Sequence, residues 1–189
     1  RPRCGRATLW PQRRGQRQSG LPPARRTMHI HQLHARLRAL GAAPVHAERV
    51  LRLWARAMPQ DSGRRRIEHF LPATLLAALP ALQAELAALA TLRSRHPGAD
   101  GGERLLVTLA DGESVESVLL PRGGLCVSTQ LGCAVGCAFC RTGVDGLQRQ
   151  LGSAEIVAQV ALARTLRPVH NVVFMGMGEP AHNLDAVLE

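Results

Sequence analysis

The sequence predicts an α/β fold, and three observations support this prediction. Helical periodicity recurs between residues 28 and 98, a hairpin pattern occupies 103–120, and strand-like and helical runs then alternate to the end of the 189-residue chain. Such alternation is typical of a parallel sheet. We therefore expect a basic tail at 1–27, a small helical domain at 28–98 and an α/β core at 99–189.

The tail accounts for most of the positive charge. Its 27 residues contain eight arginines and no acid, whereas the whole chain has a net charge of +10, so about +2 remains for everything after Thr27. Its Pro, Gly, Gln and Arg composition lacks hydrophobic periodicity, which predicts disorder. It is either a basic RNA-binding arm or a stretch upstream of a misplaced start. We favour the second interpretation, because Met28 opens the first periodic segment.

Three helices are expected in the helical domain. The first ends at Gly41, the second runs from about Pro44 to Ala57, and the third covers about 73–89 with an interruption or kink near Pro80. The inward-facing residues of the first two are Leu33, Leu37, Leu40, Val50, Leu51, Leu53 and Trp54. No stretch is long and apolar enough to span a membrane.

The α/β core is expected to begin with a hairpin that turns at Asp111 and Gly112. Alternation in its second strand puts Glu116 on one face with Ser114 and Val118. The run LCVSTQ then predicts a strand, and HNVVFMG predicts another.

Between these two strands, Ser153 is expected to cap a helix that runs to about Arg164, with Glu155 in its first turn. Ligands in such folds bind beyond the carboxyl ends of the strands. A cysteine-rich loop and the loop GMGEP follow the two strands there.

The cysteines of the first loop are the strongest chemical signal. Cys133, Cys137 and Cys140 follow the spacing C-x3-C-x2-C, and three thiolates on a short loop suit three irons of a four-iron cluster. The fourth iron is then open to a substrate or cofactor. Structural zinc with His170 or His182 is the alternative, although zinc sites usually pair two separate C-x2-C or C-x2-H halves.

The residues around the cysteines carry a family resemblance. The run LCVSTQLGCAVGCAFCRTGVDGLQRQLGSAEIVAQV, followed by NVVFMGMGEPAHNLDAVLE, resembles the RlmN/Cfr family of radical S-adenosylmethionine enzymes that methylate adenosine in ribosomal RNA. The match covers 103–189 well and 32–58 weakly. It implies the opening strands of a partial (β/α) radical-SAM barrel, preceded by a small helical accessory domain and a β-hairpin. The implied cofactors are a [4Fe-4S] cluster and S-adenosyl-L-methionine.

The resemblance also assigns roles to individual residues. It implies that Glu116 is the general base and that Cys126 resolves a protein-RNA link through a disulfide. Gly178 and Glu179 would hold the methionine end of the cofactor. Phe139 is expected either to offer a face to its adenine ring or simply to pack the loop.

The implied reaction is methylation of adenine C2 in 23S ribosomal RNA, and also in tRNA, through a methyl-cysteine intermediate. The implied partners are these RNAs and an electron donor such as flavodoxin, for a cytoplasmic protein that is monomeric at full length. No cysteine follows Cys140. The methyl-carrying cysteine is therefore expected beyond Glu189, and this chain is expected to be an inactive, truncated fragment.

Three positions depart from the family pattern: Arg141 after the cluster, Leu147 in place of an aromatic residue, and His182 in place of an aliphatic one. The choice between C2 and C8 stays open, and so do two other functions. One is a radical S-adenosylmethionine enzyme with a different substrate, and the other is a non-catalytic fragment that binds metal or nucleic acid.

Overall fold

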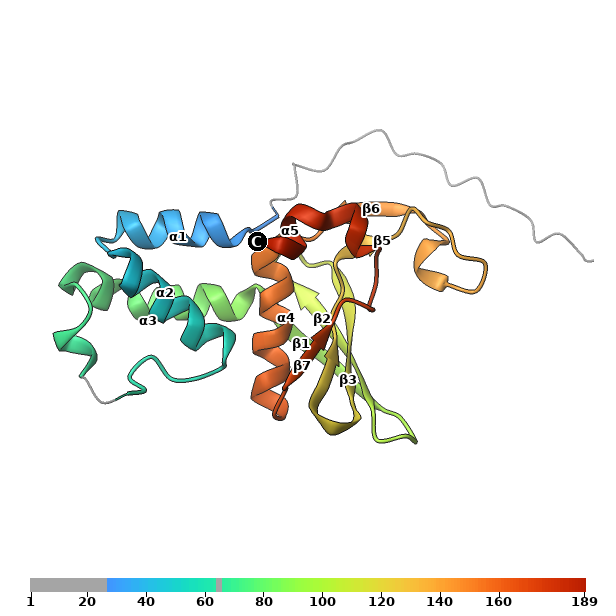
Figure 1. Cartoon of the computed structure of the whole chain (residues 1–189), viewed down its shortest axis with the longest axis horizontal. Coiled ribbons are helices and arrows are strands. Elements are labelled where there is room, and N and C mark those ends of the chain that lie inside the picture. The colour runs from blue at the N-terminus through green and yellow to red at the C-terminus, as the bar shows by residue number, and fades with distance from the viewer. Residues whose placement is uncertain (1–26, 64–65) are drawn as a thin grey trace, which may run out of the picture.

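The computed structural model describes residues 27–63 and 66–189 (Figure 1). The tail expected at 1–27 therefore lies outside the described residues, apart from Thr27, and its two interpretations stay open. Among the described residues, no helix combines the length and the apolar character needed to cross a membrane.

Three helices form the first part of the structure, as expected. They are α1 (Ile30–Ala39), α2 (Pro44–Ala55) and α3 (Ala73–Ala88), with a short 3₁₀ turn at Ile67–His69 before α3. Gly41 follows α1 with a φ of +82°, which suits glycine at a helix end. The expected inward residues are buried, except that Leu40 and Trp54 are only partly so.

The third helix is not interrupted, so that part of the expectation at Pro80 is wrong, whereas a kink there stays a prediction. Helix α3 continues through Pro80 from Ala73 to Ala88, and Pro80 lies on its exposed side. The leucines on the opposite side are buried in the core, and their packing outweighs the backbone hydrogen bond that a proline removes. These residues are Leu75, Leu79, Leu82 and Leu86.

A five-stranded sheet follows the helices, in the order β1-β2-β3-β4-β7. Its strands are β1 (Ala90–Pro97), β2 (Glu103–Leu109), β3 (Ser114–Leu120), β4 (Gly124–Cys126) and β7 (Asn171–Val173). Neighbours are antiparallel as far as β4, and only β4 and β7 are parallel. The sheet is therefore mixed, because the hairpin joins the edge of the parallel pair that the sequence predicted.

Strand β1 was not expected, since 90–97 falls in the range assigned to the helical domain. It is an edge strand that is largely exposed, so its polar sequence lacks the alternation that reveals a half-buried strand. The expected boundary between residues 98 and 99 lies in the turn that connects β1 to its partner β2.

A second, two-stranded sheet was also missed. Strands β5 (Gln130–Gly132) and β6 (Leu147–Gln150) pair antiparallel at the two ends of the cysteine-rich segment. Each strand is too short to show a periodic pattern, and their pairing closes a long loop that the sequence alone does not reveal.

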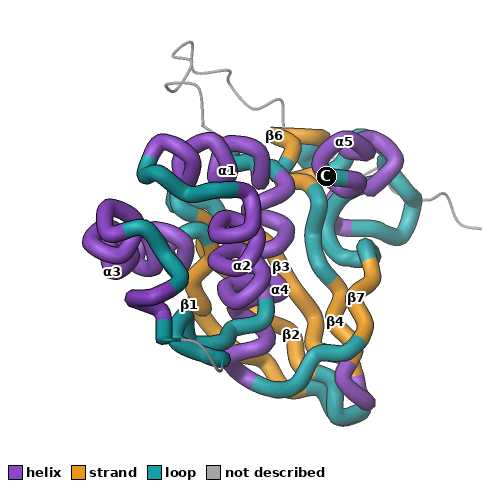
Figure 2. The backbone as a smooth tube through the Cα atoms, turned by 60° about the vertical axis from the view of Figure 1, so that its left-hand side comes forward, coloured by secondary structure: helices purple, strands orange, loops and turns teal. Residues whose placement is uncertain are grey.

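Helix α4 (Ser153–Leu166) contacts both the sheet and the helical part, as Figure 2 shows, and it joins them in one core. Gly152, rather than Ser153, occupies the N-cap position. Glu155 lies in the first turn as expected, and its Oε2 accepts the Gly152 N–H at 2.7 Å. The described chain ends with a 3₁₀ turn at Pro180–Asn183 and α5 (Leu184–Leu188).

Candidate active site

The open face of the main sheet carries two of the predicted site residues. Residues of β3 alternate between buried and half-exposed, and Glu116 lies on the half-exposed side with Val118. Val118 pairs with Cys126 of β4, and paired residues share a face. The register therefore brings Glu116 and Cys126 to the same face, opposite the apolar face that forms the core.

Glu116 is held at its side chain and at its backbone. Its Oε1 accepts a hydrogen bond from Nη1 of Arg104 at 2.9 Å, between side chains that are 40% and 53% exposed. Its backbone carbonyl accepts the Ser128 hydroxyl at 2.5 Å. An exposed ion pair adds little stability, so the chief effect of Arg104 is to orient the carboxylate.

Cys126 is a buried free thiol at the end of β4, with 9% of its surface exposed. Burial raises the pKa of this thiol, because the thiolate would lose its hydration. The group is therefore kept as a neutral thiol, unlike a cysteine activated for direct nucleophilic attack.

The cysteine loop, residues 133–146, projects beyond the sheet between β5 and β6 (Figure 1). Cys133 is buried at its neck, Cys137 is exposed and Cys140 is half-buried. The Cys133 N–H donates to the carbonyl of Gly146 at 3.1 Å, which closes the neck. A Cβ on Gly132 would lie 2.0 Å from that carbonyl oxygen, so the neck needs glycine there.

The donor set of three thiols on one loop is compatible with an iron-sulfur cluster. Hydrogen bonds from Thr142 lower the pKa of the Cys140 thiol, which favours the thiolate that binds iron. In the described part of the chain, no three cysteine or histidine ligand atoms around this loop lie within 4.8 Å of one another. Cysteines bound to separate irons of a cluster need no such convergence.

The zinc alternative would place His170 or His182 beside the cysteines, and among the described residues neither histidine belongs to a convergent group of three with them. His170 precedes β7, where its N–H bonds to the Gly123 carbonyl at 2.8 Å. It therefore lies at the end of the parallel pair opposite to the cysteine loop. His182 lies in the 3₁₀ turn before α5, and its carbonyl accepts the Gln150 amide at 2.7 Å.

Phe139 is 93% exposed, so it does not pack the loop. Its ring is free to contact a ligand, and its stacking on an adenine ring stays a prediction. Two of the departures from the family pattern, Arg141 and Leu147, are also exposed on or beside this loop.

The glycines of the GMGEP loop are required by the chain itself. A Cβ on Gly176 would lie 2.7 Å from the backbone of Val127, and one on Gly178 would lie 2.5 Å from the Cβ of Gln130. Gly178 also has a φ of +101°, a conformation that favours glycine. The absence of a side chain at these two positions therefore allows a close approach to the segment that leads into the cysteine loop.

Hydrogen bonds tie the two loops together. The Met177 carbonyl accepts the N–H groups of Thr129 and Gln130 at 2.9 and 3.2 Å. The Met177 N–H donates to Ser128 Oγ at 2.8 Å, and the Glu179 N–H donates to Gln130 Oε1 at 2.8 Å. The Glu179 carboxylate accepts the Ala181 N–H at 3.0 Å through Oε1, at the carboxyl end of β7.

A buried glutamine of α4, Gln159, supports this arrangement, although no sequence motif marked it. Gln159 Oε1 accepts the Ser128 N–H and the Ser117 hydroxyl, each at 2.9 Å, and its Nε2 donates to the Ser128 carbonyl at 2.9 Å. We call residues 128–130 with Gln159 the polar joint. The sequence carried one signal for this role: Gln159 is a polar residue four positions after Glu155, on the buried side of the helix, and buried polar groups usually form hydrogen bonds.

Arg149 of β6 was missed as well. Its guanidinium is 9% exposed and lies 2.8 Å from carboxylate oxygens of both Asp111 and Glu155. Burial alone would lower the pKa of Arg149, but the two carboxylates outweigh this effect and raise that pKa. The ion pairs connect the hairpin turn, the cysteine loop and the start of α4.

The chain is similar to known methyltransferases. Proteins from Aromatoleum aromaticum and Azoarcus sp., each named a probable RNA methyltransferase, are 71% and 69% identical to 86% of this chain. The chain spans 46% and 47% of their lengths, about half. A radical SAM methyltransferase from Sphaerobacter thermophilus aligns with a TM-score of 0.59 and 34% identity over 86% of this chain and 49% of that structure. No protein-family model matches. The α/β fold with a mixed sheet is thus the fold of that methyltransferase over most of this chain.

Proposed function

We propose that this chain carries the cluster-binding part of a radical S-adenosylmethionine methyltransferase that acts on RNA. The polar joint is the observation that carries the proposal. It fixes the cysteine loop and the GMGEP loop to each other at the carboxyl ends of β4 and β7, where ligands bind in such folds. The names of the similar proteins support the same activity.

Cys133, Cys137 and Cys140 would hold a [4Fe-4S] cluster, and Glu179 with Gly178 would hold the methionine end of S-adenosyl-L-methionine. When bound, these groups supply reductive cleavage of the cofactor and a 5′-deoxyadenosyl radical. The chain itself would present the three cysteine thiolates and the Glu179 carboxylate, which would contact the cofactor, on two loops whose ends are held in place. Phe139 would cover the adenine ring of the cofactor.

Glu116 and Cys126 would act on the substrate from the open face. Glu116, oriented by Arg104, would remove the proton from the methylated adenine. Cys126, as a thiolate, would attack the sulfur of the cysteine that is joined through its former methyl carbon to the adenine. The disulfide would form as the carbon–sulfur bond breaks, and the carbon would keep the electron pair and take up a proton, which releases the methylated RNA. The raised pKa of Cys126 means that this step needs a base to remove the thiol proton.

The substrate class would be ribosomal RNA, with adenine C2 of 23S RNA as the target, and tRNA as a second substrate. The helical part α1–α3 would contribute to RNA binding as an accessory domain. A flavodoxin-like protein would supply electrons to a cytoplasmic monomer. The methyl-carrying cysteine would belong to a part of the protein outside this chain.

Replacement of the loop cysteines tests the cluster assignment. Cys133→Ala, Cys137→Ala and Cys140→Ala should each abolish the absorbance near ~400 nm after anaerobic reconstitution and the formation of 5′-deoxyadenosine. Cys126→Ala is the matched control, because it should keep both signals. In protein that also contains the methyl-carrying cysteine, Cys126→Ala should stall turnover with protein attached to RNA. An intact cluster in the three loop variants would refute the assignment.

Mass spectrometry of ribosomal RNA and tRNA from cells with and without the intact gene tests the substrate. Loss of methylated adenine in the deletion strain is expected. Unchanged RNA, together with cofactor cleavage by the purified protein, would instead indicate a radical enzyme with another substrate.

A further inference from the structure

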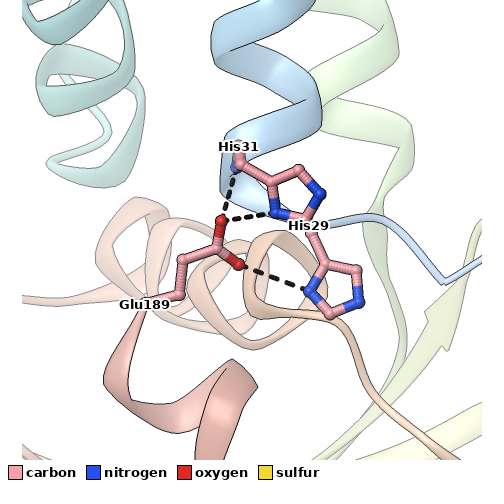
Figure 3. Close-up of side chains that lie close together, drawn as sticks. All are labelled: His29, His31 and Glu189. Carbon is pink, nitrogen blue, oxygen red and sulfur yellow. Dashed lines mark hydrogen bonds and ion pairs between the residues drawn. The ribbon is translucent and has the colours of Figure 1, made fainter.

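Three metal-ligating side chains converge far from the cysteine loop in the sequence. His29 precedes α1, His31 lies in its first turn, and Glu189 follows α5 (Figure 3). The Nδ1 atom of His31 lies 2.7 Å from Glu189 Oε1, and that of His29 lies 3.3 Å from Oε2. Among the described residues, this is the one group of three such side chains with all ligand atoms within 4.8 Å.

The backbone explains why the two imidazoles face the same way. His29 is the N-cap of α1 and has extended dihedral angles, with φ of −111° and ψ of 155°. This extended residue places its ring beside that of His31, and the ring centroids lie 5.3 Å apart with 25° between the planes. The His-x-His spacing at a helix start therefore presents two nitrogen atoms side by side.

Hydrogen bonds from the backbone of His31 and the hydroxyl of Ser153 orient the Glu189 carboxylate. Oε1 of Glu189 accepts the His31 N–H at 2.6 Å, and Oε2 accepts the hydroxyl of Ser153 at 2.6 Å. The same hydroxyl accepts the Ile30 N–H at 2.8 Å. Each carboxylate oxygen has a further lone pair on the imidazole side, and that of Oε1 meets Nδ1 of His31 in a hydrogen bond of 2.7 Å, which a bound ion would replace. Hydrogen bonds of this kind orient metal-binding carboxylates in proteins.

We propose that His29, His31 and Glu189 bind one divalent transition-metal ion, of which zinc is the best match. Two imidazoles and a carboxylate suit zinc, and three protein ligands leave one coordination position for water. The side chains are 29%, 67% and 25% exposed, so the site is accessible to the ion. Binding joins the starts of α1 and α4 to the end of α5.

The test uses tag-free protein whose cysteine loop already holds its cluster. At micromolar free Zn²⁺, elemental analysis should find one zinc per chain in addition to the iron. His29→Ala, His31→Ala and Glu189→Gln should each weaken zinc binding by at least about tenfold, and Ser153→Ala by about 10- to 100-fold. His34→Ala, which changes another histidine of α1, is the matched control and should bind zinc normally.

Cobalt provides a second measurement that does not depend on the variants. Visible Co²⁺ bands without sulfur-to-cobalt charge transfer support the site, whereas a thiolate band would place the metal on cysteine and overturn it. Absence of zinc in the wild type, or unchanged binding in folded His29→Ala and His31→Ala proteins, would also overturn it. Circular dichroism without zinc confirms that each variant is folded. These readouts require no methyl transfer, so a failure of the proposed methylation would not affect them.

Discussion

The cysteine loop and the polar joint beneath it are built in opposite ways. Residues 134–139 of the loop are exposed, whereas Ser128, Gln130 and Gln159 of the joint are at most 1% exposed. Hydrogen bonds link Ser128 to Gln159, and Gln130 to the Glu179 N–H of the GMGEP loop. The loop presents the thiols that we propose as cluster ligands, and the joint holds the segment from which the loop begins. Stability and ligand binding should therefore respond to different substitutions, although the two regions are adjacent in the sequence.

The largest expected effect is on the joint. Gln159→Leu leaves the N–H and carbonyl of Ser128 and the hydroxyl of Ser117 buried without this partner. Because each lost partner costs about 1 to 3 kcal/mol, the free energy of unfolding should fall by about 3 kcal/mol or more. Gln148→Leu, which changes an exposed glutamine of β6, should change it by less than about 0.5 kcal/mol. Urea unfolding measures the free energy of unfolding of both variants. Equal losses would contradict the proposal that the joint, rather than the exposed residues beside it, determines stability.

Two glycines sharpen the comparison further. Gly178→Ala forces a Cβ to within 2.5 Å of Gln130 at a φ of +101°, so we expect a loss of about 2 to 3 kcal/mol. Gly136 in the cysteine loop also has a positive φ, of +67°, but a Cβ there meets nothing within 4 Å. Gly136→Ala should therefore cost only about 1 kcal/mol of backbone strain. Thermal unfolding of the two variants under the same conditions measures both losses. A larger loss for Gly136→Ala than for Gly178→Ala would contradict this prediction.

The smallest effect is a pH dependence at Cys126. Burial raises the pKa of its thiol above the ordinary value of about 8.5, so the thiolate forms only at a higher pH than in an exposed cysteine. The test uses Cys4→Ser protein loaded with its cluster, so that Cys126 is the free cysteine that remains. The rate at which iodoacetamide alkylates Cys126 should still rise with pH where the rate for a small exposed thiol has already reached its maximum. Peptide mass spectrometry follows the reaction, and a plateau at or below pH 8 would contradict the burial.

The sequence predicted the elements that have strong local signals. Apolar spacing indicated α1 and α2, and the Asp111 and Gly112 turn indicated the hairpin. The face that carries Glu116 followed from simple alternation, and the register then added Cys126 to it.

The missed features depend on long-range contacts. Strand β1 is exposed at the sheet edge, and β5 and β6 pair only after the cysteine loop closes. Pro80 is tolerated because the other side of α3 is buried. The carboxylate of Glu189 meets His31 across 158 positions, and no local pattern predicts such a meeting.

The closed neck of the cysteine loop has a consequence for proteolysis. Arg141 is exposed in the projecting segment, and exposed loop tips are preferred sites of nicking. Strands β5 and β6 and the ion pairs of Arg149 lie outside that segment. A single tryptic cut after Arg141 would therefore leave two pieces that stay associated until a denaturant separates them, with Cys133, Cys137 and Cys140 all on the piece that ends at the cut.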